Sequence, residues 1–377
     1  MKINIYNKLY YLSYFLLLIY TLCNRVTFLI PVLPVLKYII PIFLVLLILI
    51  QSRKYKLNCL MIVFMLMALS FVVFLRTKEE FLLCTILYIL AAKDVKIDEF
   101  IKKDVKYKLF ILLFVIICYK LGLTSSNIFS RSDGTIRNTL GFAHPNQLGL
   151  CLFSISCGIA FIHYKKYKIT DYLIFIMSLI ICHSVCDSRS SFFGILIVLL
   201  IALFRKFIEN NKLINKLIVF LPEVLFLLSL LFTILYTNNF QIAYDVNKVL
   251  NSRLYHASAF LNYYGINLFG HYFDYYGLTN LRYDLRGLTI LDNAYMHILI
   301  HFGVIQTVLV LLSYSKLLKD SCTNKKYEVF IYLVPFLIYG LMERHIFEIQ
   351  YNCVLLLLST FIYLKEFQTK TKNHINI

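Results

Sequence analysis

Apolar runs long enough to cross a lipid bilayer recur along the whole 377-residue chain. Hydrophobic residues make up 60% of the sequence and charged residues only 15%, so a water-soluble fold could not cover its surface with polar groups. About twelve runs are candidate spanning helices. They lie near 9–23, 28–50, 57–75, 81–92, 108–123, 145–163, 171–186, 190–204, 214–236, 293–315, 327–342 and 351–364. The sequence therefore predicts an all-α polytopic integral membrane protein, with residues 1–377 as a single transmembrane domain.

Lysine and arginine are unequally distributed among the segments that connect these runs. Residues 93–108 hold six of them, whereas residues 124–144 hold only Arg131 and Arg137. Cytoplasmic loops of membrane proteins are enriched in these two residue types. We therefore expect both termini to be cytoplasmic and 124–144 to lie outside. The net charge of +18 follows from the same bias and gives no reason to expect nucleic acid as a partner.

Two of the outside segments are rich in polar residues. The first leads into Pro145, which fits the first turn of a helix because its missing N–H would be unpaired there anyway. A polar cap at a helix start explains Pro145 but not the preceding His144 or the two arginines. The second segment, 237–292, has more than fifty residues between the ninth and tenth runs, and loops of that length are usually functional. We expect a large extracytoplasmic loop at 237–292.

Arginines lie at the outer ends of several runs. They are Arg131, Arg137, Arg189 and Arg253. The guanidinium group is planar, stays charged at physiological pH and donates hydrogen bonds in a fork that fits phosphate and carboxylate. A site that holds a diphosphate outside the cell would need such residues. The alternative is that each arginine anchors its helix at the level of the lipid headgroups.

The tenth run begins with DNAYMHILIHFGVI, in which Asn293, His297 and His301 recur every four residues and so share one helix face. Ionisable groups in a span usually face the protein interior or a wet cavity. Two histidines at this spacing can bind a metal, but zinc needs a third protein ligand and none is evident nearby in the sequence. We therefore expect a polar lining and no metal. Asp292, just before the helix, is either a cap or a base at the edge of a cavity.

The eleventh run ends in GLMERHIFEIQYN, so Glu343 and Glu348 lie at or near the expected outer boundary. An unpaired carboxylate is unfavourable there, and we expect a partner among the arginines.

Four segments, taken in order, resemble the motif series of bacterial O-antigen and capsular polysaccharide polymerases of the Wzy type. They are GFAHPNQLG (141–149), DSRSSFFG (187–194), SRLYHASAFLNYYGINLFG (252–270) and DNAYMHILIHFGVI (292–305). The long outside loop precedes the last segment, and the resemblance covers roughly residues 130–350. The related O-antigen ligases usually have histidine where this chain has Asp292, which favours a polymerase.

The resemblance implies a GT-C-like membrane glycosyltransferase with about 12 spanning helices in the bacterial plasma membrane. Its substrate would be an undecaprenyl-diphosphate-linked oligosaccharide, polymerised at the outer leaflet into capsule or O-antigen without a cofactor. Its partners would be membrane lipid, a flippase and a chain-length regulator. The catalytic residues would be Arg137, Arg189, Arg253 and Asp292. The substrate-binding residues would be Arg131, His144, Asn146, His256, Asn293, Tyr295, His297 and Glu343.

Two questions stay open at the level of the sequence. The first is the base, for which Asp292 has His256 and Glu343 as rivals. The second is the activity, because a ligase that attaches a finished glycan to an acceptor, or a flippase for the same lipid-linked repeat, would share much of the pattern. A flippase should carry charges along a path through the membrane and often has repeated halves. Here the charges gather on one face, which favours glycosyl transfer.

Overall fold

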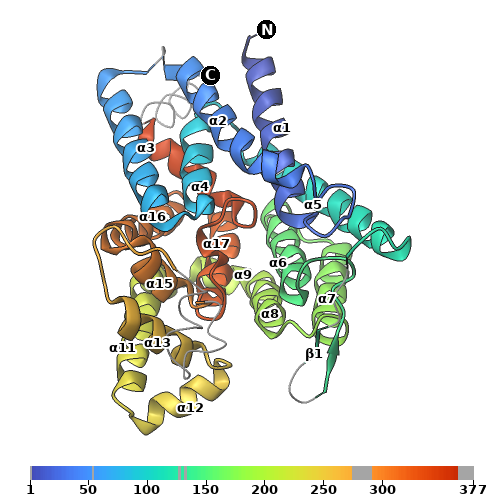
Figure 1. Cartoon of the computed structure of the whole chain (residues 1–377), viewed down its shortest axis with the longest axis vertical. Coiled ribbons are helices and arrows are strands. Elements are labelled where there is room, and N and C mark those ends of the chain that lie inside the picture. The colour runs from blue at the N-terminus through green and yellow to red at the C-terminus, as the bar shows by residue number, and fades with distance from the viewer. Residues whose placement is uncertain (1, 53–54, 126–128, 131–133, 274–290, 364–377) are drawn as a thin grey trace.

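The computed structural model describes residues 2–52, 55–125, 129–130, 134–273 and 291–363, and this part of the chain is nearly all helical (Figure 1). A short antiparallel pair of strands, β1 (Phe129–Ser130) and β2 (Ile136–Arg137), is the exception. The α-helices are α1 (Lys2–Leu22), α2 (Leu33–Ser52), α3 (Leu57–Thr77), α4 (Glu80–Ala91), α5 (Ile97–Lys120), α6 (Pro145–Ile162), α7 (Ile169–Ser184), α8 (Arg189–Leu203), α9 (Arg205–Asn210), α10 (Lys212–Ile218), α11 (Leu221–Thr237), α12 (Gln241–Val249), α13 (Arg253–Tyr264), α15 (Ala294–His297), α16 (Val304–Thr323), α17 (Tyr327–Tyr339) and α18 (Ser359–Ile362). A π-helix, η2 (Ile298–Phe302), and two 3-10 helices, η3 (His345–Phe347) and η4 (Cys353–Leu358), complete the set.

Three helices, α2, α3 and α6, are long and apolar enough to cross a membrane. The pair α10 and α11 adds a fourth if it is one span bent by 54° at its break. The helices α5 and α16 are also long, but their lysines and acidic residues reduce their apolar character. Several of the other predicted runs form shorter apolar helices, such as α4, α7, α8 and α17. The described residues thus make a helical membrane protein with three or four candidate spans.

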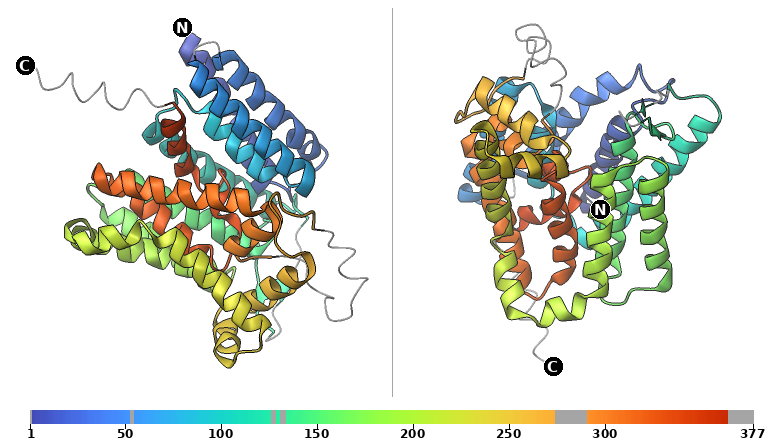
Figure 2. Two further views of the ribbon diagram at one scale, coloured as in Figure 1. Left: turned by 90° about the vertical axis from the view of Figure 1, so that its left-hand side faces the viewer. Right: turned by 90° about the horizontal axis from the view of Figure 1, so that it is seen from below.

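Helix α17 lies at the centre of the fold, where it packs against α6 and α8 and also against α11 and α16 (Figure 1). The helices α5 to α8 form one group and α1 to α4 another, while α11 and α16 run side by side (Figure 2). Nearly every residue of α6 and α17 is buried, whereas α3 buries only four and exposes apolar side chains such as Phe64. An apolar helix buried on one side only is suited to contact lipid on the other.

The connections between helices contact one another in two separate sets. In one set, the Thr27 backbone N–H donates to the carbonyl of Leu123 at 3.0 Å. In the other, the Lys93 ammonium lies 4.7 Å from the ring centroid of Tyr55. The first set also joins Ser125 to Arg25 and Asn138 to Val185, and the second joins Arg205 to Tyr164 and Asn215 to Tyr327. With both termini expected inside and the predicted runs crossing in alternation, each of these contacts joins connections or run ends that are expected on the same side of the membrane.

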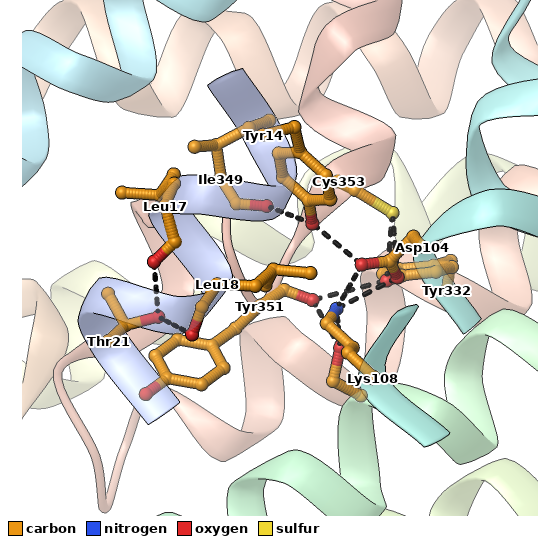
Figure 3. A network of polar contacts seen from close by, with 11 residues as sticks. Tyr14, Leu17, Leu18, Thr21, Asp104, Lys108, Tyr332, Ile349, Tyr351 and Cys353 are labelled. Atoms are coloured by element: carbon orange, nitrogen blue, oxygen red, sulfur yellow. Dashed lines mark hydrogen bonds and ion pairs between the residues drawn. The ribbon is translucent and has the colours of Figure 1, made fainter. Parts of the chain in front are cut away.

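Most of residues 93–108, which the charge bias marks as a cytoplasmic connection, is helical. Helix α5 begins at Ile97 and buries Asp104 and Lys108 completely. The Lys108 ammonium lies 2.8 Å from the Asp104 carboxylate and donates to Ser154 Oγ at 2.6 Å (Figure 3). The hydroxyl of Tyr14 donates to Asp104 Oδ1 at 2.6 Å. The charge count placed Lys108 in a loop because the sequence does not reveal these partners.

This network joins α1, α5 and α6 around one buried ion pair. Asp104 and Lys108 are four residues apart and so lie on the same face of α5. Each charge has an opposite charge and a neutral hydrogen-bond partner, which offsets the large desolvation cost of burying ions. Both side chains are completely buried, and their contacts therefore fix how these three helices pack.

The chain from Glu343 to Asn352 crosses the protein interior without forming an α-helix. Its carbonyl groups accept hydrogen bonds from side chains of the surrounding helices: Ile346 from Tyr314, Phe347 from Thr85, Ile349 from Tyr14, and Tyr351 from Ser154 and Tyr332. Irregular backbone is tolerated at membrane depth only where protein buries it and pairs its polar groups. The predicted twelfth run, 351–364, accordingly forms the 3-10 helix η4 and the short α18 rather than a spanning α-helix.

The predicted loop 237–292 contains two helices, α12 and α13, in the part that the structure describes. Residues 274–290 lie outside the described residues. Because α13 packs against α11, its first residue, Arg253, is held against the helical bundle.

Candidate functional site

Glu343 lies at the centre of a polar cluster in the turn that follows α17. Its Oε1 accepts hydrogen bonds from Ser190 Oγ at 2.8 Å and Asn146 Nδ2 at 2.9 Å. Arg253 Nη2 lies 3.5 Å from the same oxygen and is the arginine partner that the sequence led us to expect for this carboxylate. Only 4% of Glu343 is exposed, so these contacts are made away from bulk water.

Arg253 is shared between two carboxylates. Its Nη2 lies 3.0 Å from Asp292 Oδ2 as well as 3.5 Å from Glu343, and its Nε donates to the Met342 carbonyl at 3.0 Å. Burial and the neighbouring charge of Asp292 raise the pKa of Glu343 above its usual range, although Arg253 opposes this. The cluster therefore holds a carboxyl group that retains its proton more readily than a solvent-exposed one.

Asn146 connects Arg137 to this cluster. Its Oδ1 accepts a hydrogen bond from Arg137 Nη2 at 2.6 Å while its Nδ2 donates to Glu343. Arg137 comes from β2, and a second hydrogen bond from its Nε to the Cys186 carbonyl at 3.0 Å fixes it against the turn before α8. One amide side chain thus joins a cation and a carboxylate from two distant parts of the chain.

His144 is the N-cap of α6, and its Nδ1 accepts a hydrogen bond from the backbone N–H of Asn146 at 3.1 Å. Partial burial and the nearby Arg137 guanidinium lower the pKa of His144 to about 4. The imidazole is therefore neutral at physiological pH and able to accept this bond. Together with Pro145 in the first turn, the cap sets the position of Asn146.

Three helices, α6, α8 and α13, begin at this cluster. Side chains from their first turns, those of Asn146, Ser190 and Arg253, all approach Glu343. The amino end of a helix carries a partial positive charge, although His144 caps one N–H group of α6 and Asn247 caps two of α13. Three such ends beside two arginines make this part of the protein favourable for an anion.

Arg189 and His256 lie at the edge of the cluster. Arg189 is the first residue of α8 and is exposed, and in the described part of the chain its side chain makes no hydrogen bond or ion pair. His256 lies on α13, three residues after Arg253, and is half-buried. Arg131 lies outside the described residues.

Asn293 and Tyr295 make their contacts with the protein interior. The Asn293 side chain accepts a hydrogen bond from the Met296 N–H at 3.0 Å and donates to the Leu341 carbonyl at 3.2 Å. The Tyr295 hydroxyl donates to the Leu337 carbonyl at 2.7 Å. Both residues anchor α15 to the end of α17 and so hold the neighbouring Asp292 in place.

His297 and His301 belong to a second cluster. His301 Nε2 lies 2.9 Å from Glu79 Oε2, and His297 Nε2 lies 3.9 Å from the same oxygen. Glu79 comes from the turn between α3 and α4, and its only trace in the sequence is an acidic pair, Glu79 and Glu80, between two apolar runs. The fold thus places a carboxylate, which the sequence did not reveal, beside the two histidines.

Arg344 completes this second cluster, with its Nη1 lying 3.6 Å from Glu79 Oε1. Burial opposes the ionisation of Glu79, but the hydrogen bond with His301 and the Arg344 charge outweigh it and hold the pKa of Glu79 well below its usual range. Glu79 is therefore a carboxylate at any physiological pH.

Comparison of the chain with protein-family models, with curated proteins and with solved structures gives no match.

Proposed function

We propose that this chain is a membrane glycosyltransferase that polymerises oligosaccharide repeat units carried on undecaprenyl diphosphate. In this proposal the chain crosses the bacterial plasma membrane about twelve times, and the cluster around Glu343 faces the outer leaflet. The product would be a capsular or O-antigen-type polysaccharide. A flippase would supply the lipid-linked repeat, and a chain-length regulator would act with the polymerase.

The observation that carries the proposal is the meeting of three helix amino ends and two arginines at one carboxylate. A glycosyl transfer from a lipid diphosphate leaves a diphosphate with developing negative charge. Fixed donors and positive charges at that point stabilise the transition state more than the ground state. The three helices start within or next to the segments that resemble the polymerase motifs.

The roles follow from how each side chain is held. Arg137 and Arg253 are fixed by hydrogen bonds and would stabilise the leaving diphosphate. Arg189 is exposed and would contact the diphosphate of the arriving lipid-linked repeat unit. Asp292 is more exposed than Glu343, so we assign it the role of base. Glu343 would orient its neighbours.

In the reaction, the acceptor hydroxyl oxygen forms a bond to the anomeric carbon of the growing chain. The bond between that carbon and the diphosphate oxygen breaks, and the diphosphate remains on its lipid. Asp292 takes the hydroxyl proton. The state between is oxocarbenium-like, so both leaving-group stabilisation and the base contribute to the rate.

The grouping of the connecting segments onto two sides is supported by the two sets of contacts between them. Contacts such as Thr27 with Leu123 join segments predicted outside, and contacts such as Lys93 with Tyr55 join segments predicted inside. If the spans were assigned wrongly, some contacts would be expected to join a segment predicted outside to a segment predicted inside. The cluster around Glu343 is built from the segments predicted outside.

The test is a reconstitution of the purified chain in lipid vesicles with a lipid-diphosphate-linked oligosaccharide. We expect a ladder of products on a gel, each longer by one repeat. Transfer of a finished glycan to a separate acceptor without a ladder would identify a ligase instead. Movement of the lipid-linked repeat across the vesicle membrane without a new glycosidic bond would identify a flippase.

A further inference from the structure

We propose that Glu79, His297 and His301 bind one divalent transition-metal ion of the zinc type. One carboxylate oxygen and one nitrogen from each imidazole lie within 4.8 Å of one another. The three residues come from two parts of the chain: Glu79 from the turn between α3 and α4, and the two histidines from α15 and the π-helix η2 that follows it. This site goes beyond glycosyl transfer and does not depend on it.

The distances fit such an ion. Zinc bonds of about 2.0–2.2 Å in a tetrahedron place neighbouring ligand atoms roughly 3.3–3.5 Å apart. The distances from Glu79 Oε2 are 2.9 Å to His301 Nε2 and 3.9 Å to His297 Nε2, one on each side of that range. Two histidines and a carboxylate form a ligand set that zinc uses when a fourth position is left to water or to another ligand.

Burial gives an independent reason for an ion. Both imidazole side chains are only 3% exposed, and His297 Nε2 has no hydrogen-bond partner among the described residues. The ring of Phe302 lies 5.2 Å from that of His297, and Phe273 lies 4.2 Å from His301. A ring nitrogen left unpaired among aromatic side chains is unfavourable. The two ring nitrogens of His301 likewise have no hydrogen-bond partner among the described residues, and a shared cation accounts for both histidines.

The backbone around His301 is held firmly. His301 lies in the π-helix η2, a conformation that is rare and often found at functional sites. The helix ends at Gly303, whose φ of 90° favours glycine. A Cβ on Gly270 would collide with the His301 carbonyl, and the His271 N–H donates to that carbonyl at 3.1 Å. The close approach of Gly270 and His271 thus holds the backbone of His301 in place.

Arg344 orients the carboxylate. It faces Glu79 Oε1 at 3.6 Å, while Oε2 faces the two histidines. Partners that hold a ligand in this way are a regular feature of metal sites. The bound ion would therefore tie the turn between α3 and α4 to the start of the tenth run, which are far apart in sequence.

The first experiment measures metal binding alone. The full chain, purified in detergent with an affinity tag that contains no histidine, is stripped with a chelator and titrated with ZnCl2 against a chromogenic competitor. We expect one zinc ion per chain at saturation, and Co²⁺ in its place should give the visible absorption of a tetrahedral site. A stoichiometry well below one, with no such Co²⁺ spectrum, overturns the proposal, and this readout is independent of any glycosyltransferase assay.

Variants locate the ion. Glu79→Gln, His297→Gln and His301→Gln should each weaken zinc binding by at least about 100-fold, since the loss of an outer partner alone weakens such sites by about 10–100-fold. The matched control is His163→Gln, because His163 pairs with Asp171 at 2.8 Å elsewhere in the structure, and it should bind zinc as the unchanged chain does. Size-exclusion profiles check that each variant is folded. Unchanged affinity in all three site variants would show that the ion binds elsewhere. If the variants do not fold, the Co²⁺ spectrum of the unchanged chain decides whether a tetrahedral metal site is present.

Discussion

Glu343 and Arg344 are consecutive residues whose side chains belong to two different clusters. Glu343 accepts hydrogen bonds from Asn146 and Ser190, while Arg344 lies 3.6 Å from Glu79. The turn after α17 is thus common to the candidate transferase site and the candidate metal site. Experiments that aim at one cluster need a readout that does not depend on the other.

Replacing Arg253 should reduce polymerisation. Arg253→Ala removes a charge-assisted contact to the leaving group, a loss on the order of 3 kcal/mol, or about a hundredfold in rate. Arg253→Lys keeps the charge but loses the fork that reaches Asp292 and Glu343, and should also be impaired. The measurement is the initial rate of ladder formation, with the amount of protein checked by blot. The control is Lys248→Ala, which should keep the normal rate because Lys248 forms an exposed ion pair with Asp245. A normal rate from Arg253→Ala would exclude Arg253 from stabilising the leaving group.

The stability of the protein should depend on pH through Glu343. Its pKa in the folded state lies above its ordinary value of 4.5, so the folded protein binds this proton more tightly than the unfolded chain. The contribution to stability is present in full below about pH 4.5 and is lost as the pH rises through the folded pKa. Glu343→Gln cannot ionise, so its melting temperature relative to the unchanged chain should rise with pH above 4.5. A difference in melting temperature that stays constant with pH would contradict the raised pKa of Glu343.

The buried pair of Asp104 and Lys108 should behave as a unit. Lys108→Met or Asp104→Leu alone leaves one uncompensated buried charge and should destabilise the protein by about 3–5 kcal/mol. The double variant removes both charges, and its loss of stability should be much smaller than the sum of the losses in the two single variants. Thermal melting followed by size-exclusion chromatography gives the comparison. Additive losses of stability would mean that the two charges do not interact. The exposed ion pair of Lys96 and Glu99 is the control, and breaking it should destabilise the protein by at most about 1 kcal/mol.

Removing the metal should lower stability more than activity. An ion at a hundred times its dissociation constant stabilises the folded state by about 2.7 kcal/mol, so chelation should lower the melting temperature of the unchanged chain. The same treatment should have little effect on His297→Gln. The transfer chemistry is assigned to arginines and Asp292, so the rate well below the melting temperature should persist after chelation. Loss of that rate in folded protein would mean that the ion takes part in the chemistry.

Sidedness can be tested by labelling a cysteine introduced at an exposed position. Asn262 lies on α13 and is exposed, and Asn262→Cys should react with a membrane-impermeant reagent added to intact cells. Lys206→Cys, on α9 and predicted inside, should react only after the cells are opened. The reverse pattern would place the candidate site on the cytoplasmic face and exclude the proposed function.

Helix starts could be predicted well where local chemistry marks them. The predicted runs at 145–163 and 190–204 match α6 and α8 to within one residue at each end. Pro145 and the polar residues around it define the start of α6, and such signals are local. The run at 351–364 failed because apolar composition does not distinguish an α-helix from a 3-10 helix. That choice depends on side chains such as Ser154 and Tyr332, which pair with the Tyr351 carbonyl.

The candidate site could be predicted only in part for the same reason. The sequence singles out Asn146, Arg137 and Arg253 because arginines and amides at the ends of apolar runs are unusual, and the structure brings these three residues together. Ser190 and Glu79 were missed, since a serine in a helix start and a carboxylate in a short turn have no distinctive pattern. Their importance comes from contacts across the fold, such as the 2.9 Å approach of Glu79 to His301.

The irregular stretch between Glu343 and Asn352 constrains the order in which the protein can assemble. Its carbonyl groups are paired by side chains of helices that are synthesised earlier, among them Tyr14 of α1 and Thr85 of α4. By itself this stretch could not pair these carbonyl groups in an apolar environment. It can occupy the protein interior only once those helices have packed together. Correct packing of the earlier helices is thus a condition for burying this stretch, and the turn of Glu343 and Arg344 forms only when that condition is met.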